Sequence, residues 1–200
     1  FIQKIIYNKW TDSVVAVSHQ VKRELIRIGI KESNITVIHN GTPKVKYEQV
    51  DRVYTEKLRE KFGIQENDFV IGSISRPKKQ IQILQALKLL EQPVTMIFCG
   101  IEATTEMQKI IAEYQLPHKV FFEGKVEEEK VLSYYGLFDC KVLASTMEGL
   151  SQSLLEAMAM GTPVIATAFA GNLDLIDNEK NGLLFENGDI EGLAKIIDKL

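Results

Sequence analysis

Two carboxylates, Glu148 and Glu156, stand eight positions apart in the stretch EGLSQSLLEAMAMGTPVIA. The residues between them predict a short helix over about 152–160, because Ser151 is a favourable N-cap and Gly161 is a favourable residue just after a helix end. A helix that only packed into a core would carry an apolar residue in place of Glu156. The position of this carboxylate therefore points to a polar partner.

The amino end of the predicted helix suits a phosphate group, because its first N–H groups lack helical partners and the helix dipole is positive there. Gly149 lets the backbone approach a ligand, and Arg76 and Lys78 bring positive charge from the loop after FVIGSI. With a rise of about 1.5 Å per residue, Glu148 and Glu156 lie on opposite sides of such an anion. A carboxylate can accept hydrogen bonds from both vicinal hydroxyls of a ribose. The spacing predicts a nucleoside diphosphate site.

Each of these residues also has a plainer interpretation. Glu148 can be a solvated loop residue, Glu156 can reach solvent from its helix, and Arg76, Lys78 and Lys79 can be ordinary surface charges. Spacing alone leaves both interpretations open.

The chain alternates short β-branched runs with helical periodicity, which is typical of βαβ units and predicts a doubly wound parallel α/β sheet of the Rossmann type. Most of the runs are continuously apolar, as in strands that are buried on both faces. We expect strands at 13–18, 35–38, 69–74, 94–100, 120–124, 140–144, 163–166 and 182–185. We expect helices at about 19–28, 51–62, 80–91, 104–114, 127–136, 151–160, 171–178 and 189–200.

In such a sheet a ligand binds outside the carboxyl ends of the strands, so the loops after strands are the ones that carry chemistry. Three predicted loops are polar there: 75–80, 125–126 and 145–151. The turn and polar residues of 39–68 indicate a boundary. We predict an N-terminal strand, helix and strand with the start of a linker (1–42), a linker and charged helix (43–66) and a Rossmann-like nucleotide-binding domain (67–200).

Several pieces of the sequence together resemble the retaining GT-B glycosyltransferases of the glycosyl transferases group 1 type (family 4). The stretch from Glu148 through Glu156 to Ala166 resembles their E-x7-E signature. Other segments resemble the family and occur in the same order along the chain: VVAVS, VIHNG, IGSISRPKKQIQILQAL, VFFEGKV, Asp139 before CKVLASTMEG, and NGLLFENGDIEGLA. The match covers nearly the whole chain. The resemblance implies that this is the C-terminal half of a GT-B fold, with the last strand, helix and strand of an N-terminal acceptor domain.

The resemblance implies roles for particular residues. Glu148 would bind hydroxyls of the donor sugar, Glu156 would bind the ribose hydroxyls, and Arg76 with Lys78 or Lys79 would neutralise the leaving diphosphate. The catalytic set is then Glu148, Arg76 and Lys78. The donor-binding set is Glu156, Gly149, Leu150, Ser151, Lys79, Lys125, Val126 and Gly72. No metal and no cofactor are expected, because basic residues and the helix N-terminus stabilise the departing charge.

Two departures from the family pattern stand out. The family's Gly-Gly-x-x-Glu reads Ala170-Gly171-Asn172-Leu173-Asp174 here, and Asp174 is one methylene shorter than glutamate. By comparison with the family, we also expect most of the N-terminal domain that binds the acceptor to be missing. We therefore expect the isolated 200-residue chain to bind nucleotide but to transfer little or no sugar.

Composition excludes several other classes of function. A net charge of −3 disfavours nucleic-acid binding, and no apolar run approaches the length of a membrane span. Cys99 and Cys140 lie in apolar runs and are expected to be buried thiols. His19 and His39 are interpreted as caps or solvated groups, and no His/Cys cluster has metal-ligand spacing.

The resemblance thus implies a retaining glycosyltransferase that moves a hexose-type sugar from a nucleotide diphosphate sugar to an acceptor hydroxyl of a glycan, lipid or small molecule. Two alternatives stay open: a nucleotide-sugar epimerase of the same fold and a catalytically silent nucleotide-sugar-binding subunit. A cytoplasmic location is expected, with the inner face of the membrane as an alternative reached through the missing domain. The sequence does not name the sugar, the base or the acceptor.

Overall fold

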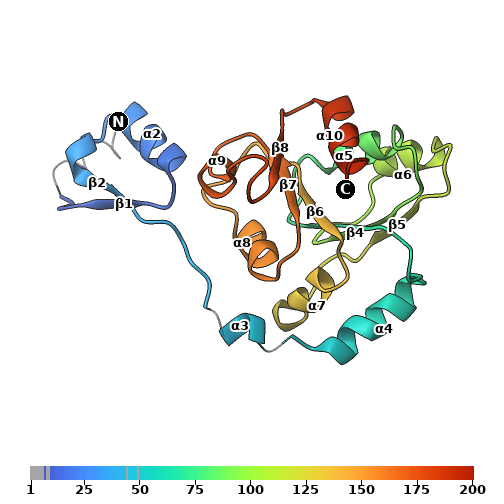
Figure 1. The fold of residues 1–200 in the computed structure, drawn as a ribbon. Helices are drawn as coiled ribbons and strands as arrows, with labels where there is room; N and C mark the ends of the chain where they lie inside the picture. Colours follow the sequence, from blue (N-terminus) through green and yellow to red (C-terminus); the bar gives the residue numbers. More distant parts are fainter. Residues whose placement is uncertain (1–6, 8–9, 44, 49) are drawn as a thin grey trace.

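The computed structural model describes residues 7, 10–43, 45–48 and 50–200. The beginning of the predicted N-terminal segment (1–6 and 8–9) and two linker positions (44 and 49) lie outside the described residues. The main domain is built on a six-stranded, fully parallel sheet with the order β5-β4-β3-β6-β7-β8 (Figure 1). Its strands are β3 (Val70–Ile74), β4 (Thr95–Cys99), β5 (Lys119–Phe122), β6 (Cys140–Leu143), β7 (Val164–Thr167) and β8 (Leu183–Phe185). This is the doubly wound Rossmann-like α/β fold that the sequence predicts.

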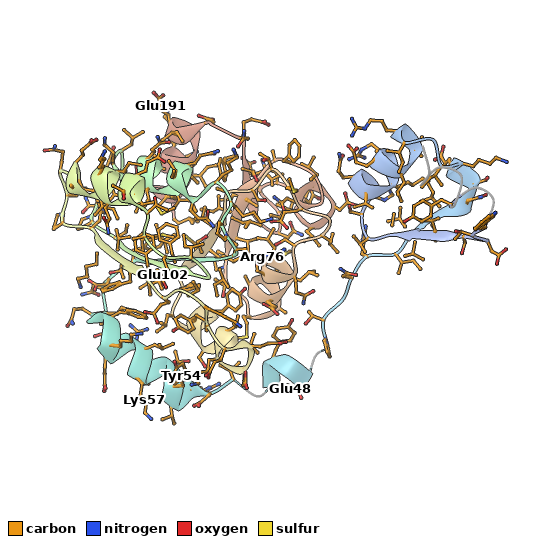
Figure 2. All side chains as sticks on the ribbon, turned by 180° about the vertical axis from the view of Figure 1, so that it is seen from behind. Glu48, Tyr54, Lys57, Arg76, Glu102 and Glu191 are labelled. Atoms are coloured by element: carbon orange, nitrogen blue, oxygen red, sulfur yellow. The ribbon has the colours of Figure 1, made fainter. Side chains whose placement is uncertain are left out.

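Helices cover both faces of the sheet, and side chains fill the space on either side of it (Figure 2). One apolar core lies under α5 (Gln80–Leu87), α6 (Thr105–Ala112) and α10 (Ile190–Ile197). The other lies under α4 (Arg52–Phe62), α7 (Val131–Tyr135), α8 (Gln152–Ala159) and α9 (Asn172–Leu175). Successive residues of each central strand point into opposite cores, which is why these strands are apolar throughout.

The N-terminal part is a smaller unit. Strands β1 (Val14–Ala16) and β2 (Ile35–Val37) pair in parallel, and α2 (His19–Arg27) and the 3₁₀ turn η1 (Glu32–Asn34) lie between them in the chain. An extended segment and the short helix α3 (Val45–Glu48) then lead to α4 (Figure 1). The division of the chain at residues 42 and 66 stays a prediction.

All eight expected strands and all eight expected helices are present, with shifted ends. The helix expected over 80–91 ends at Leu87, because Lys88, Leu89 and Leu90 donate to carbonyls three residues back. The helix expected over 127–136 begins as the 3₁₀ turn η2 (Glu128–Lys130) before α7. The helix expected over 171–178 is only the four-residue α9. The short helix α3 has no counterpart in the prediction.

Both cysteines are free and buried, as predicted. None of the helices that the structure describes is long and apolar enough to cross a membrane.

Candidate functional site

The strand order reverses between β3 and β6, and this crevice is where a doubly wound sheet binds its ligands. The loops after these two strands, 75–79 and 144–151, meet there. Together with the loops after β4 and β5 they enclose a cleft of about 600 Å³. The cleft is lined by Ile74, Ser75, Arg76, Lys78, Cys99, Gly100, Lys125, Val126, Val131, Glu148, Ser151, Gln152, Ser153 and Glu156. Seven of the residues singled out in the sequence therefore lie around one cavity: Arg76, Lys78, Lys125, Val126, Glu148, Ser151 and Glu156.

The amino end of α8 forms one wall of the cleft. Ser151 caps the helix as predicted, because its side chain accepts a hydrogen bond from the N–H of Leu154. The carboxyl end of α8 also agrees with the prediction, since Gly161 follows the last turn with a φ of 75°. Gln152 and Ser153, the first residues of the helix, line the cleft. The positive end of the helix dipole therefore faces the space where the sequence predicts a diphosphate.

Glu156 reaches the same cleft from the second turn of α8, although the residue is 8% exposed. The Tyr135 hydroxyl lies 3.4 Å from its Oε2 and donates a shorter hydrogen bond, 2.9 Å, to the carbonyl of Ser153. Burial, and then the nearby Glu156 carboxylate, hold the pKa of Tyr135 well above its usual value. Tyr135 therefore remains a neutral donor that fixes both Glu156 and the first turn of α8.

Glu148 and Lys78 pair with each other across the cleft. The Lys78 Nζ lies 3.1 Å from Glu148 Oε1 and donates to the Met147 carbonyl at 2.9 Å. Both side chains are mostly buried, at 19% and 15% exposure, so the pair is shielded more than a surface ion pair. Among the described residues Arg76 has no carboxylate partner. The sequence suggested separate roles for Glu148 and Lys78, but did not indicate that they contact each other.

Gln80 organises the basic loop from beneath. Its side-chain amide donates to Ser75 Oγ at 2.9 Å and to the Arg76 carbonyl at 2.8 Å, and its oxygen accepts from the Lys78 N–H at 2.6 Å. Gln80 is 3% exposed, so these bonds are sheltered from water. The sequence motifs did not single out Gln80, although a polar residue at a position where the helix faces the core was an available signal.

Gly100 is a second residue of the site that the sequence motifs did not single out. It follows β4 with a φ of 93°, and a Cβ there would lie 2.5 Å from the Ser75 carbonyl oxygen. Only glycine therefore allows the loops after β3 and β4 to approach this closely.

Four residues of the predicted donor-binding set do not line the cleft. Gly72 lies inside β3, where a Cβ would overlap the Phe138 ring, so its geometry indicates packing rather than donor contact. Lys79 precedes α5 and is exposed outside the cavity, so the structure brings Lys78, not Lys79, to the cleft. Leu150 is buried, and Gly149 faces Val17 of the N-terminal part.

The loop that departs from the family pattern packs tightly on the loop before α8. Ala170 adopts a left-handed φ of 52°, a conformation that glycine takes more easily. A Cβ on Gly171 would lie 1.9 Å from the Gly149 carbonyl oxygen, and the Gly171 N–H donates to the Glu148 carbonyl at 3.3 Å. The position of Glu148 thus depends on a close backbone crossing at Gly171.

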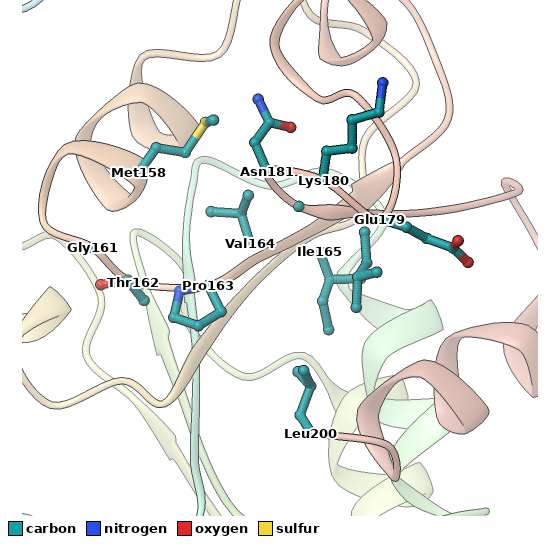
Figure 3. A pocket seen from close by; sticks show the side chains of 12 residues that line it. Met158, Gly161, Thr162, Pro163, Val164, Ile165, Glu179, Lys180, Asn181 and Leu200 are labelled. Carbon is teal, nitrogen blue, oxygen red and sulfur yellow. The ribbon is translucent and has the colours of Figure 1, made fainter.

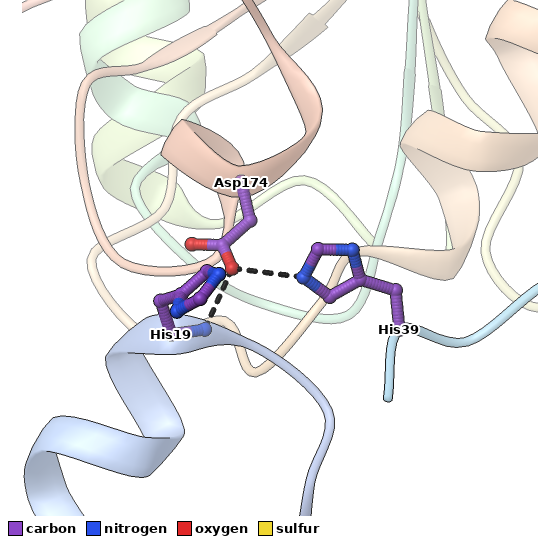
Figure 4. Close-up of side chains that lie close together, drawn as sticks. All are labelled: His19, His39 and Asp174. Atoms are coloured by element: carbon purple, nitrogen blue, oxygen red, sulfur yellow. Dashed lines mark hydrogen bonds and ion pairs between the residues drawn. The ribbon is translucent and has the colours of Figure 1, made fainter. Parts of the chain in front are cut away.

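Asp174 joins the N-terminal part to the main domain (Figure 4). Its Oδ2 accepts from the His19 N–H at 2.6 Å and lies 3.1 Å from His39 Nε2. Potential ligand atoms of His19, His39 and Asp174 all lie within 4.8 Å of one another, so these three could approach a cation. Sequence spacing gave no sign of this cluster. The bonds present make it a contact between the two parts.

Two other cavities differ from this cleft in position. One, of about 460 Å³, is lined by the segment from Gly161 to Ile165 and by Leu200, at the amino ends of β7 and β8 (Figure 3). The other, of about 480 Å³, lies between α2 and the loops at 146–149 and 169–170. The first is at the wrong end of a parallel sheet for a ligand site, and the second faces the N-terminal part.

Replacing Gln80 with leucine will leave the Ser75 hydroxyl, the Arg76 carbonyl and the Lys78 N–H without their partner. We expect a melting temperature lower by a few degrees and a several-fold weaker affinity for a nucleoside diphosphate, measured by calorimetry. Gln82→Leu is the matched control, because Gln82 bonds Asn187 and Gly188 outside the cleft. If both variants lose affinity equally, Gln80 does not act through the loop.

Gly171→Ala will force the loops at 149 and 171 apart. We expect destabilisation by about 2 kcal/mol or more, seen in urea unfolding, together with weaker nucleotide binding, since Glu148 moves with its loop. Gly41→Ala serves as the control, because a Cβ at Gly41 meets nothing within 4 Å. A Gly171→Ala variant as stable as the parent would contradict the close crossing.

Comparison with known proteins agrees with this geometry. The uncharacterized glycosyltransferase MJ1069 of Methanocaldococcus jannaschii is 28% identical over 204 residues, covering 100% of this chain and 51% of that protein. The capsular polysaccharide biosynthesis glycosyltransferase CapM of Staphylococcus aureus is 27% identical over 199 residues, covering 94% of this chain and 51% of CapM. Anabaena HepE, solved in complex with UDP-glucose, matches with a TM-score of 0.86 and 26% identity over 99% of this chain and 56% of HepE.

The chain thus spans about half the length of the curated relatives it matches. The family model described as Glycosyltransferase Family 4 matches residues 2–44, and the model described as Glycosyl transferases group 1 matches residues 54–200. The second match alone covers the whole sheet, α8 and every residue of the cleft. The chain therefore belongs to the glycosyl transferases group 1 family.

Proposed function

We propose that this chain is the donor-binding part of a retaining glycosyltransferase. It transfers a hexose-type sugar from a nucleotide diphosphate sugar to an acceptor hydroxyl, in the synthesis of a polysaccharide, glycolipid or other glycoconjugate. The observation that carries the proposal is the cleft between β3 and β6, which holds two carboxylates, three basic side chains and a helix amino end around one cavity. The helix amino end and the basic side chains can bind phosphates, and the two carboxylates can accept hydrogen bonds from sugar and ribose hydroxyls.

In the proposed reaction the diphosphate lies at the amino end of α8, beside Arg76 and Lys78. These charges and the helix N–H groups stabilise the negative charge that develops as the bond from the anomeric carbon to the phosphate oxygen breaks. Glu148 binds hydroxyls of the sugar, and Glu156 binds those of the ribose. The acceptor oxygen forms its bond to the anomeric carbon on the face that the diphosphate leaves, and the hydroxyl proton passes to the departing phosphate oxygen. No step of this reaction calls for a metal ion.

The ion pair between Lys78 and Glu148 fits this assignment. Without a donor, each group neutralises the other in a partly buried position. A bound diphosphate offers Lys78 a stronger anionic partner, and sugar hydroxyls offer Glu148 new donors. Donor binding therefore exchanges one set of charge-assisted bonds for another rather than creating buried charge.

The relatives support the kind of donor and product. Anabaena HepE is solved with UDP-glucose, which favours a UDP-sugar as the first donor to test. CapM takes its name from capsular polysaccharide biosynthesis, which favours a glycan acceptor. The acceptor would enter from the side of the N-terminal part, where the cavity beneath α2 borders the loop that carries Glu148.

The activity is tested with the full-length protein. UDP, GDP and ADP and their sugars are titrated in turn, and the release of free nucleoside diphosphate is followed with varied acceptors. A glycoside product with the donor's anomeric configuration is expected. An inverted anomeric product would contradict retention, and a sugar inverted at C2 would instead identify an epimerase. Binding without release under any acceptor would identify a silent subunit.

Glu156→Ala will leave the ribose hydroxyls without their acceptor, so we expect nucleotide binding to weaken by about 1–3 kcal/mol. Glu156→Gln, which keeps the side-chain shape, should weaken binding in the same direction and so separates loss of charge from loss of packing. Calorimetry with the tightest-binding nucleoside diphosphate measures the change. Glu66→Ala, at an exposed glutamate outside the cleft, is the control. Unchanged affinity in a folded Glu156→Ala protein would rule out the ribose assignment.

A further inference from the structure

A lysine is buried directly beneath the proposed donor site. Lys141 is the second residue of β6, is 0% exposed, and is among the largest fully buried side chains of the protein. Leu143, two positions along the strand and hence on the same face, packs in the core beneath α8. A position of this kind normally holds an apolar residue, because lysine is almost never fully buried without a partner.

The partner of Lys141 belongs to the cleft. The Lys141 Nζ lies 2.7 Å from the hydroxyl oxygen of Ser153, and Ser153 lines the cavity from the first turn of α8. Ser153 Oγ is also 3.3 Å from Ser151 Oγ, the cap of the same helix. One hydroxyl group therefore separates the lysine nitrogen from the helix end at which the diphosphate would sit.

No ion pair joins Lys141 to a carboxylate within the part of the chain that the structure describes. The charged groups that act on Lys141 are Glu148 on the loop before α8 and Glu156 on α8. Tyr135 on α7 bonds the carbonyl of Ser153, the residue that Lys141 contacts. Burial lowers the pKa of Lys141 to about 7, and the two glutamates act in the opposite direction. Tyr135 carries no charge in this range, because its own pKa is raised by burial.

We propose that Lys141 is a positioning residue of the donor site, which takes up a proton when a nucleoside diphosphate binds and acts on it through Ser153. This inference rests on the proposed function. A bound diphosphate places negative charge at the amino end of α8, and that charge favours the ammonium form of a buried amine nearby. The ammonium group in turn aligns the Ser153 hydroxyl, which holds the phosphate, and offsets the charge of Glu148 and Glu156.

The direction of the pH dependence follows from this coupling. In the free protein the amine loses its proton as the pH rises through about 7. Binding raises the pKa of Lys141, so above pH 7 each binding event takes up to one proton from solution. Affinity for the diphosphate therefore falls as the pH rises above 7, by up to tenfold per pH unit, until the pKa of the bound state is reached.

The test is calorimetric titration at pH 8 with UDP, GDP or ADP, whichever binds tightest, in two buffers of different ionisation enthalpy. We expect the parent protein to take up a substantial fraction of one proton. Lys141→Met, which keeps the length without the amine, is expected to show no such uptake, several-fold weaker affinity at pH 7 and a flat pH profile. The same ligand is used throughout, so protons of the ligand itself cancel in the comparison.

Two further variants separate charge from packing. Ser153→Ala keeps the lysine but removes the connecting hydroxyl, and is expected to reduce the proton uptake. Lys195→Met, at an exposed lysine of α10, is the control and should match the parent protein. If Lys141→Met does not fold, the pH dependence of the Lys141 Cε chemical shift, with and without the nucleotide, measures the same coupling in the parent protein.

Proton uptake in Lys141→Met equal to that of the parent protein would overturn the role of Lys141. So would a Cε titration that the nucleotide does not shift. If the parent protein binds none of the three nucleoside diphosphates, the proposed function itself fails. Nucleotide binding with a pH-independent affinity would leave the proposed function intact and contradict only the inference about Lys141.

Discussion

The amino end of α8 is the constraint on which the rest of the site depends. The first N–H groups of a helix have no helical partner, and leaving them unpaired inside a protein is costly. The Ser151 hydroxyl accepts a hydrogen bond from one of these groups, the N–H of Leu154. The first residues of the helix, Gln152 and Ser153, line the cleft. The loops after β3 and β6 then carry groups that complete an anion site around this end. Because the sheet order reverses between these strands, the two loops diverge enough to leave room for a ligand.

Polar groups around this helix end are held in place by neutral donors rather than by fixed ion pairs. Tyr135 donates to the Ser153 carbonyl in the first turn of α8, and the Gln80 amide bonds three groups of the basic loop. Amides and hydroxyls keep the same hydrogen bonds over a wide pH range. The charged groups of the cleft can therefore change partners or protonation without the scaffold changing with them. The ion pair of Lys78 and Glu148 is the clearest case of a contact that a ligand can replace.

Much of this arrangement could be predicted from the sequence, because it depends on local patterns. Continuous apolar runs predict central strands, and a serine before a small-residue helix predicts the cap at Ser151. Helix geometry, loop position and the resemblance to a known family together predicted one site for Arg76, Lys78, Glu148 and Glu156. The structure places all four on the same cleft. The donor-binding role of Gly72 stays a prediction, because its position in β3 also fits a packing role. A glycine within a strand has two explanations, ligand approach and close packing, and only the neighbouring Phe138 ring distinguishes them.

Contacts between distant segments could not be predicted, because a single sequence read by itself carries no signal for them. His19, His39 and Asp174 look like isolated residues in the sequence, yet the structure joins Asp174 to His19 and His39 across 155 and 135 positions. The Asp174 carboxylate accepts a hydrogen bond from the His19 N–H, the first N–H group of α2. The hydroxyl of Ser18, the residue just before α2, accepts a hydrogen bond from the Val21 N–H. Two acceptors at one helix end, one from each part of the protein, tie the N-terminal part to α9. The loop before α9 is the one that crosses Gly149 beside the predicted sugar-binding carboxylate. Asp174 of the main domain therefore completes the cap of a helix in the N-terminal part, and this contact links the arrangement of the two parts to the geometry around Glu148. Aspartate makes the contact even though it is one methylene shorter than the family's glutamate.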